Sequence, residues 1–163
     1  MRAITIWQPW ASLIAIGTKR FETRSWATSY RGPIAIHAAL RPAHELDRQT
    51  SEAIARAFKD YTAIEDLPSY IAGLPHGAIV ATADLVDCHP IRRNSEDDAI
   101  YIRDSERMFE YWLSPTDSEY LFGNWLPGRY AWELANMQML DAPIPAKGQQ
   151  GLWNWEWEGE RQC

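Results

Sequence analysis

Cysteine is scarce in this chain of 163 residues, and the two that it has, Cys88 and Cys163, lie far apart. They can form neither a disulfide framework nor a Cys-x-x-Cys metal motif, which is typical of proteins in a reducing compartment. The histidines have no zinc-like spacing with each other or with Cys88, so we expect no metal site and no cofactor; they are His37, His44, His76 and His89.

Long apolar runs are also missing. No stretch approaches the roughly 18 apolar residues that a membrane span needs, and the start of the chain has no secretory pattern of basic residues, apolar run and cleavage site. Low-complexity runs and internal repeats are absent, while 46% of the residues are hydrophobic and 23% are charged. We therefore expect a globular cytoplasmic protein whose single domain, residues 1–163, has a core of its own.

Positive charge is in short supply overall, since the net charge is −6. Phosphate contacts dominate nucleic-acid affinity and need a positive surface, so this value argues against a protein that coats DNA. The charge is unevenly distributed, however. Residues 1–44 hold six basic residues against one acidic residue, a balance of +5 that leaves −11 for the remainder. A basic patch of this kind is still sufficient to engage one strand or one nucleotide.

The densest group of charges is the segment Gly17–Arg24, where three cations and one carboxylate fall within eight residues. Gly17 is a natural end for a short helix over Pro9–Ile16, because glycine adopts the left-handed C-terminal turn without a Cβ penalty. The residues that follow predict a strand over 19–26. The segment thus connects a short apolar helix to a charged strand.

Strand alternation would place Arg20, Glu22 and Arg24 on one face and Phe21 and Thr23 on the other. A carboxylate between two guanidiniums is held ionised by charge-assisted hydrogen bonds, with spare donors for a polar or anionic ligand. The same pattern also fits a solvated edge strand whose surface ion pairs contribute little energy. The spacing alone leaves both interpretations open.

The pattern Gly17-x-Lys19-x-x-Glu22-x-Arg24 resembles the ASCH domain family, named for the activating signal cointegrator 1 homology domain. The resemblance is continuous over residues 4 to 40 and includes neighbouring motifs in the family's order, at Gln8–Leu13, Arg24–Trp26 and Arg31–Ala38. It is looser afterwards, in Gly77–Val86 and Gly128–Glu133. The tail Ala146–Trp153 is similar to bacterial and phage-type members in particular.

This resemblance implies an α+β domain: a PUA-like small mixed β-barrel with peripheral helices. The hydrophobic periodicity predicts strands over Ala3–Trp7, 19–26, Ile34–Ala39, Gly77–Val86, Tyr130–Leu140 and Leu152–Trp157. It predicts helices over Pro9–Ile16, His44–Lys59, Ser69–Ala72 and Ser105–Leu113. The short polar connection between the second and third strands suggests that these two pair as an antiparallel hairpin or meander.

Recognition of RNA, a single-stranded nucleic acid or a modified nucleoside is the function that the resemblance implies first, in a cleft between the barrel and the first helix. Single-stranded or flipped-out nucleotides suit such a cleft better than a duplex. Trp10 and Tyr30 would stack on a base, although a tryptophan is also an ordinary core residue. Gln8, Ser12 or Glu22 would read the base edge, while Lys19, Arg24 and Arg31 would hold phosphate. Arg20 and His37 complete the candidates; His37 would close the floor of the cleft, although a histidine on an apolar strand is also typical of a hydrogen-bonded core residue.

A metal-independent hydrolase is the alternative. Some members of the family are amidohydrolases that deacetylate N4-acetylcytidine with a lysine-activated threonine nucleophile on the following strand. Here Glu22 stands where that threonine would align, and Thr23 is one strand step away, on the opposite face. Hydrolysis, including ribonuclease action, would instead use Glu22 as the general base, with Lys19 and Arg24 stabilising the oxyanion. A third alternative is a coregulator-like interaction module that uses the acidic surface.

Overall fold

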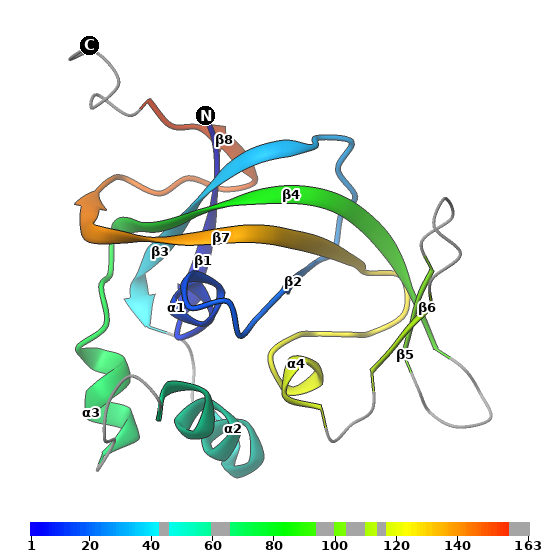
Figure 1. Cartoon of the computed structure of the whole chain (residues 1–163), viewed down its shortest axis with the longest axis horizontal. Helices are drawn as coiled ribbons and strands as arrows, with labels where there is room; N and C mark the ends of the chain where they lie inside the picture. The colour runs from blue at the N-terminus through cyan, green and yellow to red at the C-terminus, as the bar shows by residue number, and fades with distance from the viewer. Residues whose placement is uncertain (43–45, 60–65, 94–99, 104–109, 114–116, 157–163) are drawn as a thin grey trace.

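The computed structural model describes residues 1–42, 46–59, 66–93, 100–103, 110–113 and 117–156 (Figure 1). Its strands are β1 (Arg2–Gln8), β2 (Phe21–Arg24), β3 (Gly32–Pro42), β4 (Ala78–Arg93), β5 (Ile100–Arg103), β6 (Glu110–Leu113), β7 (Tyr130–Pro145) and β8 (Leu152–Asn154). Its helices are α1 (Trp10–Ala15), α2 (Arg48–Phe58), α3 (Leu67–Ala72) and α4 (Ser118–Leu121). The fold is α+β, as predicted, and is consistent with a PUA-like small barrel.

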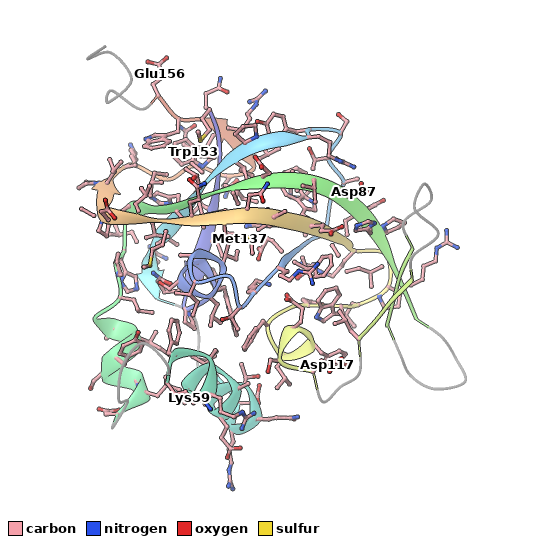
Figure 2. All side chains as sticks on the ribbon, viewed as in Figure 1. Lys59, Asp87, Asp117, Met137, Trp153 and Glu156 are labelled. Atoms are coloured by element: carbon pink, nitrogen blue, oxygen red, sulfur yellow. The ribbon has the colours of Figure 1, made fainter. Side chains whose placement is uncertain are left out.

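The main sheet has the strand order β2-β7-β4-β3-β1-β8, and β5 and β6 form a hairpin on the far end of β4. All these neighbours are antiparallel except β1 and β3, which run parallel. The long strands β4 and β7 curve across the molecule, with α1 against one side of the sheet (Figure 1). Side chains fill the space between the strands and the helices (Figure 2).

The core is formed by the inward-facing side chains of β1, where buried and exposed residues alternate, and by the apolar residues of α1. Ile4 and Ile6 point inwards, while Trp7 points outwards and is 46% exposed. Residues Ala11–Ala15 of α1 are all buried, so this helix belongs to the core and does not lie on the surface. Trp132 of β7 is fully buried, and Trp26 stands edge-on against it at a centroid distance of 4.5 Å. Most of the core is therefore arranged around α1.

The sheet curls so that β2, at one end of the strand order, reaches β1 near the other end. One Nη of Arg24 donates a hydrogen bond of 2.8 Å to the carbonyl oxygen of Thr5. In the described part of the chain, backbone pairing does not close this part of the barrel, since β2 pairs with β7 and β1 pairs with β3 and β8. A side chain of the charged segment thus bridges the gap between the two strands.

Two expectations about the fold are wrong. Strands β2 and β3 do not form a hairpin, because β2 pairs with β7 and β3 pairs with β1 and β4. The helix expected over Ser105–Leu113 is contradicted at Glu110–Leu113, which is strand β6; residues 104–109 lie outside the described residues. Both errors concern strand pairing, which overrides local pattern: β2 pairs with the distant β7, and β6 pairs with its neighbour β5.

Strand β4 is longer than predicted. It continues past Asp87 to Arg93 because this part pairs with β7 and β5. In the part of the chain that the structure describes, no helix combines the length and the apolarity needed to cross a membrane.

Candidate functional site

The turn after α1 directs the charged segment into the protein. Gly17 has a φ of +77°, and the backbone N–H groups of Thr18 and Lys19 both donate to the carbonyl oxygen of Leu13. Gly17 therefore ends the helix in the left-handed conformation, as predicted. The consequence is that Lys19, which follows the turn, is only 1% exposed.

Lys19 is held by acceptors on two separate parts of the chain. Its Nζ donates to the carbonyl oxygens of Phe21 and, at 2.7 Å, of Phe122, and it lies 3.5 Å from Oε2 of Glu22. Two of the three N–H donors of the ammonium are thus used by backbone carbonyl oxygens, beside the ion pair with Glu22. Lys19 therefore joins the charged segment to the loop after α4 and orients Glu22.

Glu22 lies between two cations at the edge of the interior. Its side chain is 13% exposed, and Nε of Arg24 lies 3.1 Å from its Oε1, within ion-pair distance although the two are not aligned as a hydrogen bond. The other oxygen faces Lys19. Because Lys19 is fully buried and Arg24 is tied to Thr5, the carboxylate is fixed in position.

Helix α4 fixes the start of β2 from the other side. The carboxylate of Glu119 accepts hydrogen bonds from the backbone N–H of Arg20, at 2.8 Å, and of Phe21, at 3.1 Å. Burial raises the pKa of Glu119, although the Lys19 charge and the two N–H donors oppose this shift. Two carboxylates, Glu22 and Glu119, thus flank the buried lysine.

A cleft of about 490 Å³ opens beside this group, between β1, β2 and the loop after α4. Its lining combines apolar side chains, one carboxylate and two guanidiniums: Thr5, Ile6, Trp7, Trp10, Glu22, Thr23, Arg24, Leu121, Phe122, Gly123, Asn124 and Arg129. Trp10 packs on Phe122 with a centroid distance of 5.8 Å. The cleft therefore has an apolar wall beside a charged one.

Of the predicted site residues, the structure brings Trp10, Glu22 and Arg24 together in this cleft, with Lys19 directly behind them. Arg20 precedes β2 and is 49% exposed, with its guanidinium over the Phe21 ring and 3.9 Å from Glu133. It is not among the residues that line the cleft. The central part of the motif is therefore a cluster, whereas Arg20 interacts elsewhere.

The remaining predicted residues lie away from the cleft. Gln8 is fully buried; its amide donates to the Pro75 carbonyl oxygen and its Oε1 accepts from the Ser12 backbone N–H, so it caps the first turn of α1. Ser12 itself is buried. Tyr30 donates its hydroxyl to the Pro33 carbonyl oxygen. These side chains serve the fold in the structure.

Arg31 forms an ion pair with Asp87 at 2.6 Å and donates to the carbonyl oxygens of Thr28 and Tyr30. Burial by itself would raise the pKa of Asp87, but the hydrogen bonds from the Cys88 N–H and the Arg31 guanidinium together have the larger effect, so the pKa is lowered overall. Arg31 thus ties the start of β3 to β4 and does not reach the cleft.

His37 is 1% exposed on β3, with Nε2 3.0 Å from the Ala146 carbonyl oxygen and Nδ1 buried without a hydrogen-bond partner among the described residues. Burial lowers its pKa below 6.5, although the Ala146 carbonyl opposes the shift. Just below pH 6.5 the unfolded chain therefore binds more protons at His37 than the folded chain does. The free energy of unfolding is highest above this pH and decreases as the pH falls through the pKa that His37 has in the folded protein.

We accordingly expect acidification from about pH 7.5 to about pH 5.5 to lower the free energy of unfolding, and His37→Gln to reduce this dependence. Urea unfolding at both pH values measures it, with His76→Gln as the matched control. Equal pH dependence in the wild type and His37→Gln would contradict the assignment.

Among the cleft residues that sequence reasoning missed are Arg129 and Trp7. Arg129 is not among the predicted site residues, yet its Nε donates to the Asn124 carbonyl oxygen and one Nη donates to that of Thr23, at 3.1 and 3.2 Å. Trp7 was assigned only to a strand. The signal for Trp7 was present in the alternation of β1, which places it on the face opposite Ile4 and Ile6. Nothing local could reveal Arg129, because its partners lie on the loop after α4 and on β2.

Thr23 occupies the cleft wall, but its hydroxyl is already engaged. It is 8% exposed, and its Oγ1 accepts a 2.9 Å hydrogen bond from the Asn124 backbone N–H. Its neighbour Gly123 allows this close approach, since a Cβ there would lie 3.1 Å from the Thr23 methyl and 2.6 Å from Nε1 of Trp125. Thr23 therefore anchors the loop that forms one side of the cleft.

Comparison with known proteins agrees with the motif. The family model of the ASCH domain matches residues 4–144. The chain is 35% identical over 88 residues to activating signal cointegrator 1 from Homo sapiens, and equally to the same protein from Mus musculus. Each match covers 52% of this chain and 14% of the relative, so the similarity concerns a small part of those longer proteins. The match to the domain over most of its length shows that this chain belongs to the ASCH domain family.

Proposed function

We propose that the cleft beside Glu22 and Arg24 binds an unstacked nucleotide of a single-stranded nucleic acid. The observation that carries this proposal is the position of Glu22, a nearly buried carboxylate fixed between Lys19 and Arg24 at the wall of a 490 Å³ cleft. A fixed carboxylate accepts hydrogen bonds from the amino and imino groups on a base edge. The cleft is within the size range of sites for small ligands.

The rest of the lining fits the other parts of a nucleotide. Trp10, half-buried against Phe122, offers an aromatic surface to a base. Arg24 and Arg129 each have guanidinium N–H groups beyond those that bond to the carbonyl oxygens of Thr5, Asn124 and Thr23, which suits phosphate. A base, its polar edge and a phosphate thus each have a matching surface.

Membership of the ASCH family, a PUA-like family, supports a nucleic-acid-binding role for this chain. The overall charge of −6 restricts how that role is fulfilled. A small site that contacts few phosphates is compatible with an acidic protein, whereas broad binding along a duplex is not. This is why we propose a single strand, of RNA or DNA, as the ligand.

The test is a fluorescence-anisotropy titration with labelled single-stranded RNA, single-stranded DNA and duplex DNA. We expect saturable binding of a single strand in preference to duplex. Arg129→Ala should weaken it about 10-fold, because one charge-assisted contact to phosphate is lost. Arg2→Ala, an exposed arginine outside the cleft, is the matched control and should have little effect. Equal effects of the two substitutions would refute the proposed site.

A hydrolase that uses Glu22 as a general base is the second candidate, favoured by the fixed orientation of its carboxylate in a cleft. The threonine mechanism is less well supported, since Lys19 directs its donors at two carbonyls and Glu22, and the Thr23 hydroxyl accepts from Asn124. Mass spectrometry of N4-acetylcytidine and RNA incubated with the protein distinguishes the candidates. Products that disappear in Glu22→Gln would establish the hydrolase.

A further inference from the structure

A second cleft, of about 700 Å³, lies beside β1, whose residues Thr5 and Trp7 contribute to its lining. Its walls are the end of β3 and the segment after β7, which contribute Leu40, Arg41, Lys147, Gln149 and Gln150 among others. Arg41 and Lys147 are exposed. None of the residues that line this cleft is acidic, although the chain as a whole has a net charge of −6.

The two clefts adjoin each other at β1, because Thr5 and Trp7 line both. Trp7 is 46% exposed and thus presents much of its indole surface at the junction. Together the clefts contain four cationic side chains, Arg24, Arg129, Arg41 and Lys147, against a single carboxylate. An aromatic residue within a basic groove is the arrangement that single-stranded nucleic-acid binders use.

The wall that carries Lys147 is held rigidly in place. The Thr5 hydroxyl donates to the Gln149 carbonyl oxygen at 2.9 Å, and His37 contacts that of Ala146 at 3.0 Å. Residue 148 must be small here, because a Cβ would come within 2.4 Å of Cε1 of His37. These contacts use the backbone of the segment, and in the described chain no ion pair engages Lys147 or Arg41.

We infer that the second cleft is a subsite for the neighbouring nucleotide of the strand whose unstacked nucleotide occupies the first cleft. Trp7 stacks on the base at the junction, and Arg41 and Lys147 contact the phosphate that follows. This inference rests on the proposed function and extends it, since it makes the ligand an oligonucleotide of at least two nucleotides. A mononucleotide would fill only half of the groove.

The experiment measures the affinity of labelled hexauridylate and hexathymidylate for six proteins: wild type, Trp7→Ala, Trp7→Phe, Arg129→Ala, Arg41→Ala/Lys147→Ala and the control Lys59→Ala. Trp7→Ala should weaken binding about 5- to 150-fold, the usual range for loss of one stacked base, while Trp7→Phe should retain most of the affinity. The double variant should lower the slope of log K against log salt by about 0.7, the value for one lost phosphate contact on a single strand.

The double variant is the decisive one, because Trp7 belongs to both clefts while Arg41 and Lys147 belong to the second alone. If the wild type binds and Arg129→Ala weakens it, but the double variant keeps the wild-type affinity and salt slope, the second subsite is refuted and the proposed function stands. That result would leave the second cleft for another ligand, such as a peptide. If the wild type binds neither oligonucleotide, the proposed function itself fails. Circular dichroism checks that each variant is folded.

Discussion

Lys19→Met should lower the free energy of unfolding by about 3–5 kcal/mol, the range found when one partner of a buried ion pair is removed. Methionine fills a similar volume but cannot donate to the carbonyl oxygens of Phe21 and Phe122, which would lose this donor inside the protein. Glu22 has two cationic partners in the described structure, Lys19 and Arg24, and the substitution would leave it with Arg24 alone. The loss combines two missing hydrogen bonds with an undercompensated charge.

Urea unfolding followed by tryptophan fluorescence measures this loss. Lys59→Met is the matched control, because Lys59 lies at the end of α2 and is exposed (Figure 2); its effect should stay within about 0.5 kcal/mol. A double-mutant cycle of Lys19→Met with Glu22→Gln would isolate the coupling between the two side chains. A loss below about 1 kcal/mol in Lys19→Met would contradict a structural role for the buried ammonium.

Arg24→Lys should weaken single-strand binding nearly as much as Arg24→Ala, by about 10- to 100-fold, although it keeps the charge. The guanidinium of Arg24 faces Glu22 through Nε and Thr5 through Nη, which positions both β2 and the carboxylate. The compact ammonium of lysine cannot make both contacts together and still address a phosphate. The shape of the Arg24 side chain is thus as important as its charge.

Anisotropy titrations of wild type, Arg24→Lys and Arg24→Ala measure this difference, with Arg2→Lys as the control at an exposed position outside the cleft. Restoration of wild-type affinity by Arg24→Lys would show that Arg24 acts as a simple point charge. In that case its bridge to Thr5 would be unrelated to binding.

The local part of the fold could be predicted from the sequence because its determinants are local. The alternation of β1, the apolar face of α1 and the left-handed turn at Gly17 are each set within a few residues. The pairing of β2 with β7 is not, since Phe21–Arg24 and Tyr130–Glu133 lie far apart in the chain. A short polar connection favoured a hairpin, and the long-range pairing prevailed.

The candidate site divides in the same way. The motif predicted that Glu22 and Arg24 act together, and the structure places them 3.1 Å apart. Hydrophobic periodicity could not show whether the Gln8 amide caps α1, as it does in the structure, or binds a ligand, because both roles need a polar side chain at that position. Arg129 and Lys147 enter the groove only through the path of the chain after α4 and β7.

Photo-crosslinking tests the central claim most directly. A single-stranded oligonucleotide that carries 4-thiouridine would be irradiated with the wild-type protein, and the crosslinked peptides would be identified by mass spectrometry. We predict crosslinks in peptides that contain Trp7, Trp10 or the loop at Phe122–Arg129, because Trp7, Trp10 and the two ends of this loop line the first cleft. Crosslinks confined to peptides of α2 or α3, or none at all under conditions where the strand is bound, would contradict the account.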